Sequence, residues 1–91
     1  MASYRLRIKK SAAKELEAIP RKADRQRIAR RIQALADDPR SHGCKKLSGS
    51  ERYRLRQGDY RIVYAIEDDE LVVYVIRIAD RKNVYRGLRG G

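Results

Sequence analysis

Hydrophobic and polar side chains alternate near the start of the chain, where Tyr4, Leu6 and Ile8 are separated by Arg5 and Arg7. A period of two is typical of a half-buried strand, because successive side chains of a strand point to opposite faces. The first element predicted is therefore a strand over residues 4–8, with its apolar side chains directed at a core.

Two helical patterns follow this strand. The first begins at Ser11, a residue type that favours helix starts, and it breaks at Pro20. The second is expected to end at Asp37-Asp38, because the residue before Pro39 is pushed out of the helical region. The apolar positions at helical spacing in the two segments are Ala12, Leu16, Ile19, Ile28, Ile32 and Leu35.

Three strands are predicted in the second half of the chain, after a loop over residues 40–51. The first spans about 52–57 and the second about 60–66, and Gly58-Asp59 between them has the composition of a short hairpin turn. The third, from Leu71 to Ile78, is apolar on both faces. We therefore expect it to lie centrally in the sheet and to be covered on both sides.

The order β-α-α-β-β-β predicts an α+β fold, with two N-terminal helices packed on one face of a mainly antiparallel four-stranded sheet. Tyr4, Leu6 and Ile8 should meet the apolar helix positions in the core. A length of 91 residues indicates one domain over 1–91. Residues 87–91 are expected to form a flexible tail.

The net charge of the chain indicates which classes of partner it binds. Lys and Arg number 23 against 12 Asp and Glu, a formal net charge of +11, which favours polyanionic ligands. A single cysteine, Cys44, excludes an intrachain disulfide, which indicates either a reducing compartment or stabilisation by a bound partner. The sequence contains no apolar run of membrane-spanning length and no apolar signal region. We therefore expect a cytoplasmic protein with no membrane partner.

An arginine cluster is the strongest candidate site. Arg54 and Arg56 stand two residues apart on a predicted strand, so their side chains point the same way. Arg61, across the predicted hairpin, is expected to share their face, and Arg77 and Arg81 could extend its rim. Guanidinium groups match phosphate oxygens bidentately, so such a cluster favours a phosphate ligand. A solvated polar face is the alternative interpretation.

Other candidate chemistry is sparse. The second helical segment carries a basic stripe that includes Arg30 and Arg31, which is either a solvated face or a source of long-range attraction for RNA. His42 and Cys44 lie close together, but no third group is positioned to orient them as a nucleophilic pair. One histidine and one cysteine also do not form a usual zinc site.

Several segments together resemble the RelE/ParE superfamily of toxin–antitoxin toxins, in particular its RelE-type branch. The resemblance covers about residues 4–86. Its matching segments, besides the first strand, are KSAAKEL at 10–16, LSG at 47–49, YRLRQGDYRIVY at 53–64 and DRKNVYR at 80–86. Their order and spacing, more than any one segment, carry the resemblance.

This resemblance implies a RelE-like fold and a toxin that enters the ribosomal A site and cleaves the mRNA there. The 2′-hydroxyl attacks the adjacent phosphate, with no metal and no cofactor required. The implied partners are a cognate antitoxin protein that neutralises the toxin, and the ribosome with its mRNA and rRNA.

The resemblance also assigns site residues. Arg61 and Arg81 would bind the phosphate oxygens where negative charge grows, and Arg54 and Arg56 would hold the backbone. Tyr85 would stack on a base or donate a proton to the leaving oxygen. The catalytic set implied by the resemblance is thus Arg54, Arg56, Arg61, Arg81 and Tyr85. The RNA-binding set predicted beside it, from the positive charge of the chain, is Arg77, Lys82, Arg30 and Arg31. Many relatives have His where this chain has Asp80, which leaves the proton-transfer assignment open.

Two other functions remain open at this stage. A ParE-like inhibitor of DNA gyrase would share the fold, although the basic set and the C-terminal Tyr85 favour the RelE type. A non-catalytic RNA-binding or ribosome-binding module would need only the net charge, which by itself gives strongly salt-dependent binding.

Overall fold

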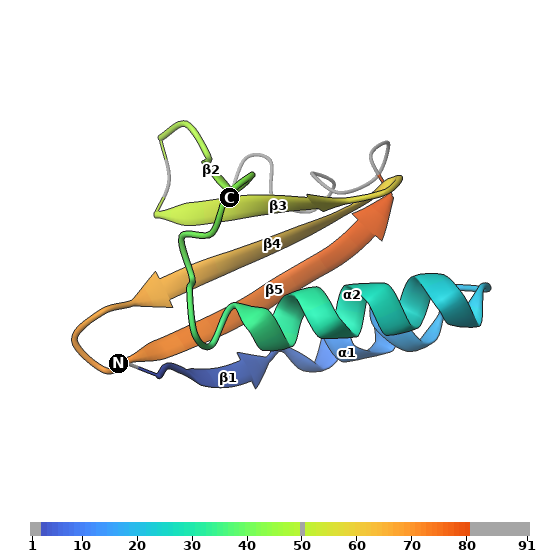
Figure 1. Ribbon diagram of the computed structural model, residues 1–91, viewed down its shortest axis with the longest axis horizontal. Coiled ribbons are helices and arrows are strands. Elements are labelled where there is room, and N and C mark those ends of the chain that lie inside the picture. Colours follow the sequence, from blue (N-terminus) through green and yellow to red (C-terminus); the bar gives the residue numbers. More distant parts are fainter. Residues whose placement is uncertain (1–2, 50, 81–91) are drawn as a thin grey trace.

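The computed structural model describes residues 3–49 and 51–80 of the chain. Its elements are β1 (Arg5–Ile8), α1 (Lys10–Glu17), α2 (Lys22–Ala34), β2 (Lys45–Lys46), β3 (Arg52–Gln57), β4 (Tyr60–Glu67) and β5 (Val72–Asp80). Figure 1 shows α1 and α2 along β5, with β1 leading into α1 and with β4, β3 and β2 fanning away from the helices. The predicted α+β class and the two N-terminal helices are confirmed.

The sheet has five strands in the order β1-β5-β4-β3-β2. β3, β4 and β5 pair antiparallel, whereas β1 pairs parallel with β5. The prediction of four strands was wrong because β2 lies inside the segment interpreted as a loop. Lys45 pairs with Arg54 and Lys46 with Tyr53. Two residues are too few to show a period, so only the pairing identifies this strand.

The core lies between the helices and one face of the sheet. Its buried cluster contains Ala12, Ile19, Ile28, Ile32 and Leu35 from the helical half and Leu55, Ile62, Tyr64, Val73, Val75 and Ile78 from the strands. Tyr4 and Leu6 pack against this cluster as expected. Ile8 does not, since it is 41% exposed. β1 ends at this residue, so Ile8 lies on the rim of the sheet rather than under the helices.

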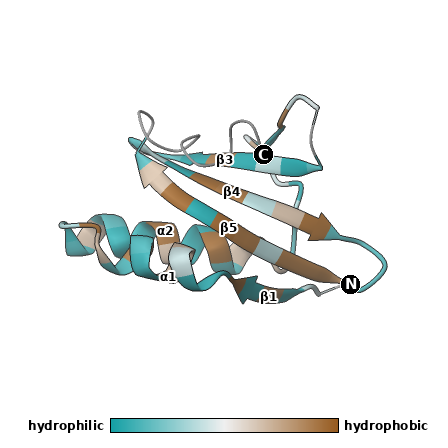
Figure 2. Cartoon of the chain, turned by 180° about the vertical axis from the view of Figure 1, so that it is seen from behind, coloured by the Kyte–Doolittle hydropathy of each residue, from teal (hydrophilic) through white to brown (hydrophobic). Residues whose placement is uncertain are grey.

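β5 lies inside the sheet, between β1 and β4, as its apolar sequence predicted. The expectation that both of its faces would be covered was wrong at Tyr74, which is 37% exposed. The two helices cover only one face of the sheet. On the other face of β5, Tyr74 is exposed, whereas Val72 is buried. Figure 2 shows that β5 is largely hydrophobic and β3 largely hydrophilic, with β4 between them.

The sequence predicted the hairpin turn more accurately than the ends of the helices. Gly58 has φ +60°, the positive φ that the first central residue of a tight hairpin turn requires. α1 begins at Lys10 with no side-chain cap, so Ser11 is not its N-cap. α2 ends at Ala34, before the predicted stop at Asp37-Asp38. Within the described residues, no helix is long and apolar enough to cross a membrane.

Candidate functional site

The sheet face opposite the helices, which we call the open face, collects arginines from three strands. Arg56 on β3 is the direct cross-strand partner of Arg61 on β4. Arg54 pairs with Val63, and Val63 pairs in turn with Arg77 on β5. Directly opposed residues on neighbouring strands have Cβ atoms about 5 Å apart and point to the same face. Arg54, Arg56, Arg61 and Arg77 therefore share the open face.

The pairing extends this basic surface across the whole sheet. Arg7 pairs with Tyr74, and Arg5 with Val72. Opposite Val63 and Tyr64, β5 carries one extra residue in a bulge, so Tyr74 and Arg77 share the open face although they are three residues apart. The basic residues that the register assigns to the open face are Arg5, Arg7, Lys45, Arg52, Arg54, Arg56, Arg61 and Arg77. Glu67 is the one acidic residue among these paired open-face positions.

Arg61 is the buried member of the cluster, with 8% of its surface exposed. Its Nη1 donates to the carbonyl oxygens of Tyr60 at 3.2 Å and Gly58 at 3.4 Å. These bonds hold the guanidinium against the hairpin turn. A cation that is anchored and largely removed from water interacts more strongly with an anion than an exposed one does.

Arg54 and Arg56 differ in exposure although they are neighbours on one strand face. Arg56 is exposed, whereas Arg54 is half-buried. The Nε of Arg54 is buried and has no hydrogen-bond partner among the described residues. A buried donor without an acceptor is costly, so this position favours an acceptor supplied by a ligand.

Arg77 is held from the helix side of the sheet. Its Nε lies 3.8 Å from Oε2 of Glu15 on α1. The other carboxylate oxygen, Oε1, accepts a hydrogen bond of 2.9 Å from the backbone N–H of Ile78. β1 has already ended at this level of β5, so Glu15 occupies the place of the missing strand. Glu15, Arg77 and Asp80 line a hollow of about 290 Å³ at this edge.

Other predicted residues lie elsewhere. Arg30 and Arg31 are on α2, with Arg30 exposed and Arg31 half-buried, so the sheet separates them from the open face. His42 is exposed in the loop before β2. Arg81, Lys82 and Tyr85 lie outside the described residues. Their roles, like the RNA-binding role of Arg30 and Arg31, stay predictions.

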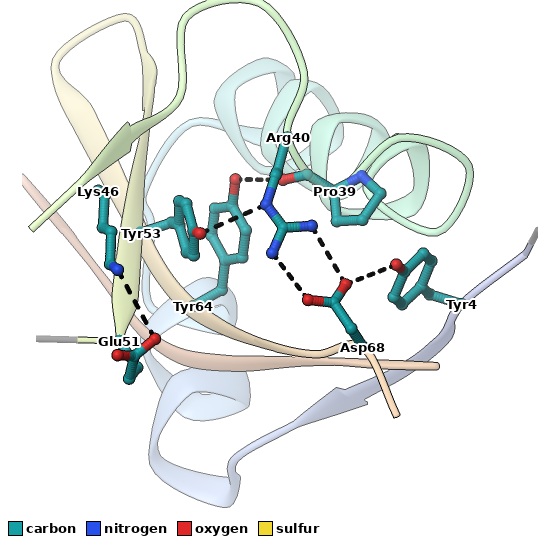
Figure 3. Close-up of polar contacts among 8 residues, drawn as sticks. All are labelled: Tyr4, Pro39, Arg40, Lys46, Glu51, Tyr53, Tyr64 and Asp68. Carbon is teal, nitrogen blue, oxygen red and sulfur yellow. Dashed lines mark hydrogen bonds and ion pairs between the residues drawn. The ribbon is translucent and has the colours of Figure 1, made fainter. Parts of the chain in front are cut away.

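A second polar cluster, the Arg40–Asp68 clamp, joins three distant segments (Figure 3). Arg40 donates to both carboxylate oxygens of Asp68, at 3.1 and 2.9 Å, and the Tyr4 hydroxyl donates to Oδ1 at 2.8 Å. The guanidinium of Arg40 also lies 5.5 Å from the ring centroid of Tyr53. Hydrogen bonds from Arg40, and then from Tyr4, lower the pKa of Asp68.

The clamp rests on a pair of stacked tyrosines. The rings of Tyr53 and Tyr64 have centroids 5.9 Å apart. The Tyr64 hydroxyl donates a buried hydrogen bond of 2.7 Å to the carbonyl oxygen of Pro39, as Figure 3 shows. Burial, and then the nearby Cys44 thiol, raise the pKa of Tyr64. The sequence analysis missed this cluster because its members are up to 64 residues apart.

The fold and the site define a small two-helix α+β domain whose open face is lined with arginines. The family profile described as the ParE toxin of the type II toxin–antitoxin system parDE matches residues 6–85. The chain is 33% identical over 84 residues to Toxin RelE of Mycobacterium tuberculosis, covering 91% of this chain and 87% of that one. The protein belongs to the RelE/ParE superfamily, the toxins of type II toxin–antitoxin systems.

Solved structures agree with this family. The archaeal RelE–RelB complex from Pyrococcus horikoshii OT3 contains a chain that matches with a TM-score of 0.77 and 29% identity, over 87% of this chain and 96% of that one. The intact Escherichia coli RelBE toxin–antitoxin complex matches with a TM-score of 0.73 and 28% identity, over 86% and 96%. The predicted RelE-like fold is therefore confirmed.

Proposed function

We propose that this toxin is a ribosome-dependent endoribonuclease that cleaves mRNA in the ribosomal A site. The observation that carries the proposal is the shared face of Arg54, Arg56, Arg61 and Arg77. Four like charges on one sheet face repel one another, and a bound phosphate backbone relieves that repulsion. The proposal is also supported by the RelE relatives, which are 33% and 27% identical to this chain.

The proposed reaction needs no group beyond the RNA and protein side chains. The 2′-oxygen forms a bond to the adjacent phosphorus as the bond from phosphorus to the 5′-oxygen breaks. One proton leaves the 2′-hydroxyl and one is gained by the 5′-oxygen, so the products are a 2′,3′-cyclic phosphate and a 5′-hydroxyl. An in-line geometry and stabilised negative charge on the phosphate oxygens are the main requirements.

Each arginine has a proposed part in that step. Arg61, which is anchored at the turn, binds the phosphate oxygens on which charge develops. The unsatisfied Nε of Arg54 takes an oxygen of the same backbone, and exposed Arg56 holds the strand beside it. Arginine is too basic to act as a general base, so none of the three removes the 2′-proton.

The remaining catalytic roles are proposed from the family resemblance. Arg81 would bind the reacting phosphate together with Arg61, and Tyr85 would stack on a base or protonate the 5′-oxygen. Asp80 is the last residue of β5 and lies opposite Tyr60 in the register. As the residue before Arg81, Asp80 is proposed either to orient that guanidinium or to exchange a proton.

A cognate antitoxin is the proposed protein partner, in the cytoplasm where ribosomes are translating. The structural relatives include complexes of RelE with RelB. A largely acidic segment would complement the eight basic residues of the open face. Because it binds only the folded toxin, such a partner would also stabilise the domain by mass action.

The proposal is tested by adding the purified protein to translating ribosomes and mapping mRNA ends by primer extension. The expected result is cleavage within the A-site codon that depends on the ribosome. Intact message in every reading frame would refute the nuclease.

A gyrase supercoiling assay is run in parallel, because the matching family profile is that of ParE. Inhibition of gyrase with no mRNA cleavage would assign the protein to the gyrase-inhibiting type. Ribosome binding with neither activity would make it a non-catalytic module.

A further inference from the structure

The open face carries an exposed aromatic residue that the proposed nuclease does not use. Tyr74 is 37% exposed, although it lies on an interior strand. Its partner on β1 is Arg7, and its partner on β4 is Ala65. A methyl group cannot cover an aromatic ring, so Ala65 leaves the tyrosine uncovered on the β4 side. The exposure of Tyr74 thus follows from its neighbours.

Exposed cations lie beside this tyrosine. Arg7 is directly opposite Tyr74, and Arg5 is two residues earlier on the same face of β1. Both arginines are exposed. Proteins bind single-stranded nucleic acids with aromatic rings flanked by arginines, because bases stack on the ring while guanidinium groups bind the phosphates.

We propose that Tyr74, Arg7 and Arg5 form a second contact site for single-stranded RNA. One base stacks on the ring of Tyr74, and Arg7 and Arg5 bind the phosphates beside it. Tyr74 lies three residues from Arg77 on β5, about 10 Å along the strand. A strand of a few nucleotides therefore spans both sites, which makes this contact a continuation of the proposed phosphate cluster.

This inference rests on the proposed function only in its choice of RNA as the ligand. The RNA is either the message itself or an unpaired segment of ribosomal RNA, since both present the same bases and phosphates. RNA fits this site better than an acidic peptide does, because a base stacks on the ring of Tyr74, whereas either ligand would contact the charges of Arg5 and Arg7. Peptide binding is nevertheless an outcome that the test distinguishes.

The test measures binding of the full-length protein to a short, fluorescently labelled 2′-O-methyl oligoribonucleotide, which lacks the attacking hydroxyl. Tyr74→Leu is expected to weaken binding about tenfold, because leucine fills similar space without an aromatic face. Tyr74→Phe is expected to bind like the parent. Thermal melting of each variant confirms that it is folded. Unchanged affinity in Tyr74→Leu overturns the proposal.

The arginine arm uses a matched charge control. Arg7→Gln is expected to weaken binding severalfold and to lower the slope of log K against log salt by about 0.7, the value for one phosphate contact on a single strand. Arg21→Gln removes the same charge from an exposed position before α2, away from the open face. An equal loss of affinity in Arg7→Gln and Arg21→Gln would indicate nonspecific electrostatic attraction and would overturn the proposal.

Two further readouts separate the remaining outcomes. The parent protein and Tyr74→Leu are each crosslinked to translating ribosomes that carry a 4-thiouridine message. A crosslink that only the parent forms identifies the RNA that contacts Tyr74, either the message or ribosomal RNA. If Tyr74→Leu weakens antitoxin binding and leaves RNA binding unchanged, the surface is a peptide site and the proposal is wrong. Oligonucleotide binding needs neither ribosomes nor cleavage. A negative cleavage assay therefore does not refute the Tyr74 site, and loss of the Tyr74 site does not refute the nuclease.

Discussion

Arg56 of β3 lies directly opposite Arg61 of β4, so two guanidinium-bearing side chains share one sheet face beside the hairpin turn. Like charges at opposed positions destabilise a sheet pair. Arg61 is nevertheless buried and anchored to the carbonyl oxygens of the turn. This opposed pair is the centre of the proposed phosphate site.

The first prediction concerns that buried arginine. Arg61→Ala is expected to reduce ribosome-dependent mRNA cleavage about 100-fold, the effect of removing one donor that stabilises developing charge. Growth arrest on expression should be relieved in parallel. Arg21→Ala, which removes an exposed arginine just before α2, is the control and is expected to cleave normally. Full cleavage by a folded Arg61→Ala protein would move the active site elsewhere.

The second prediction concerns the carboxylate between α1 and β5. Glu15→Ala removes the acceptor of the Ile78 N–H and the partner of Arg77, and is expected to lower the free energy of unfolding by about 1–2 kcal/mol. Glu15→Gln keeps an acceptor oxygen and should lose less. Urea denaturation measures both.

The control for this position is Glu17→Ala, an exposed residue of the same helix, which is expected to change stability by less than about 0.5 kcal/mol. Equal stability of Glu15→Ala and the parent would show that Glu15 does not hold the β5 edge.

The third prediction is an acid dependence of the Arg40–Asp68 clamp. The hydrogen bonds from Arg40 and Tyr4 lower the pKa of Asp68, so its contribution to stability is present above the unfolded-state pKa of about 3.9. That contribution is lost as the pH falls through the lower pKa of the folded protein. The stability difference between the parent and Asp68→Asn should therefore shrink in acid.

Urea denaturation at a series of pH values measures this difference. In an Arg40→Gln background the pH dependence attributable to Asp68 should be smaller, because the largest cause of the lowered pKa is gone. A difference that stays constant from neutral pH into acid would contradict the linkage.

The fourth prediction is an alkaline dependence of Tyr64. Burial raises the pKa of Tyr64, so the folded protein keeps the phenol protonated after the unfolded chain begins to ionise near pH 10. Its contribution is present below that pH and is lost as the pH rises further. Tyr64→Phe should cost about 1 kcal/mol at neutral pH, through loss of the hydrogen bond to Pro39, and the cost should narrow above about pH 10.

Tyr53→Phe is the matched control for the neutral-pH cost, because its hydroxyl accepts only an exposed bond from Arg40. We expect a change below about 0.5 kcal/mol for this variant in thermal or urea denaturation. A larger cost at Tyr53 than at Tyr64 would contradict the assignment of the buried phenol as the stabilising group.

Much of the fold could be predicted because its signals are local. The alternation of Tyr53, Arg54, Leu55 and Arg56 indicated β3, and Gly58 indicated the turn into β4. The family resemblance added the RelE-like arrangement. β2 could not be predicted, since two residues carry no period and their pairing with β3 depends on the rest of the sheet.

The candidate site was predictable only in part. Strand alternation sufficed to group Arg54 with Arg56, and the short turn brought Arg61 to the same face. Nothing local indicated that Arg61 is buried, that Glu15 holds Arg77, or that Asp68 meets Arg40 and Tyr4. These contacts join residues from different elements, so they depend on how the elements pack.

The amino-acid sequence by itself determined the periods of the strands and helices, the positive charge and the family, because these are properties of neighbouring residues and of composition. The tertiary structure alone decided that β1 lies beside β5, and hence that Arg5, Arg7 and Tyr74 join the arginines of β3 and β4 on one face. Strand order is set by the packing of the whole sheet against its two helices, and no local pattern encodes it.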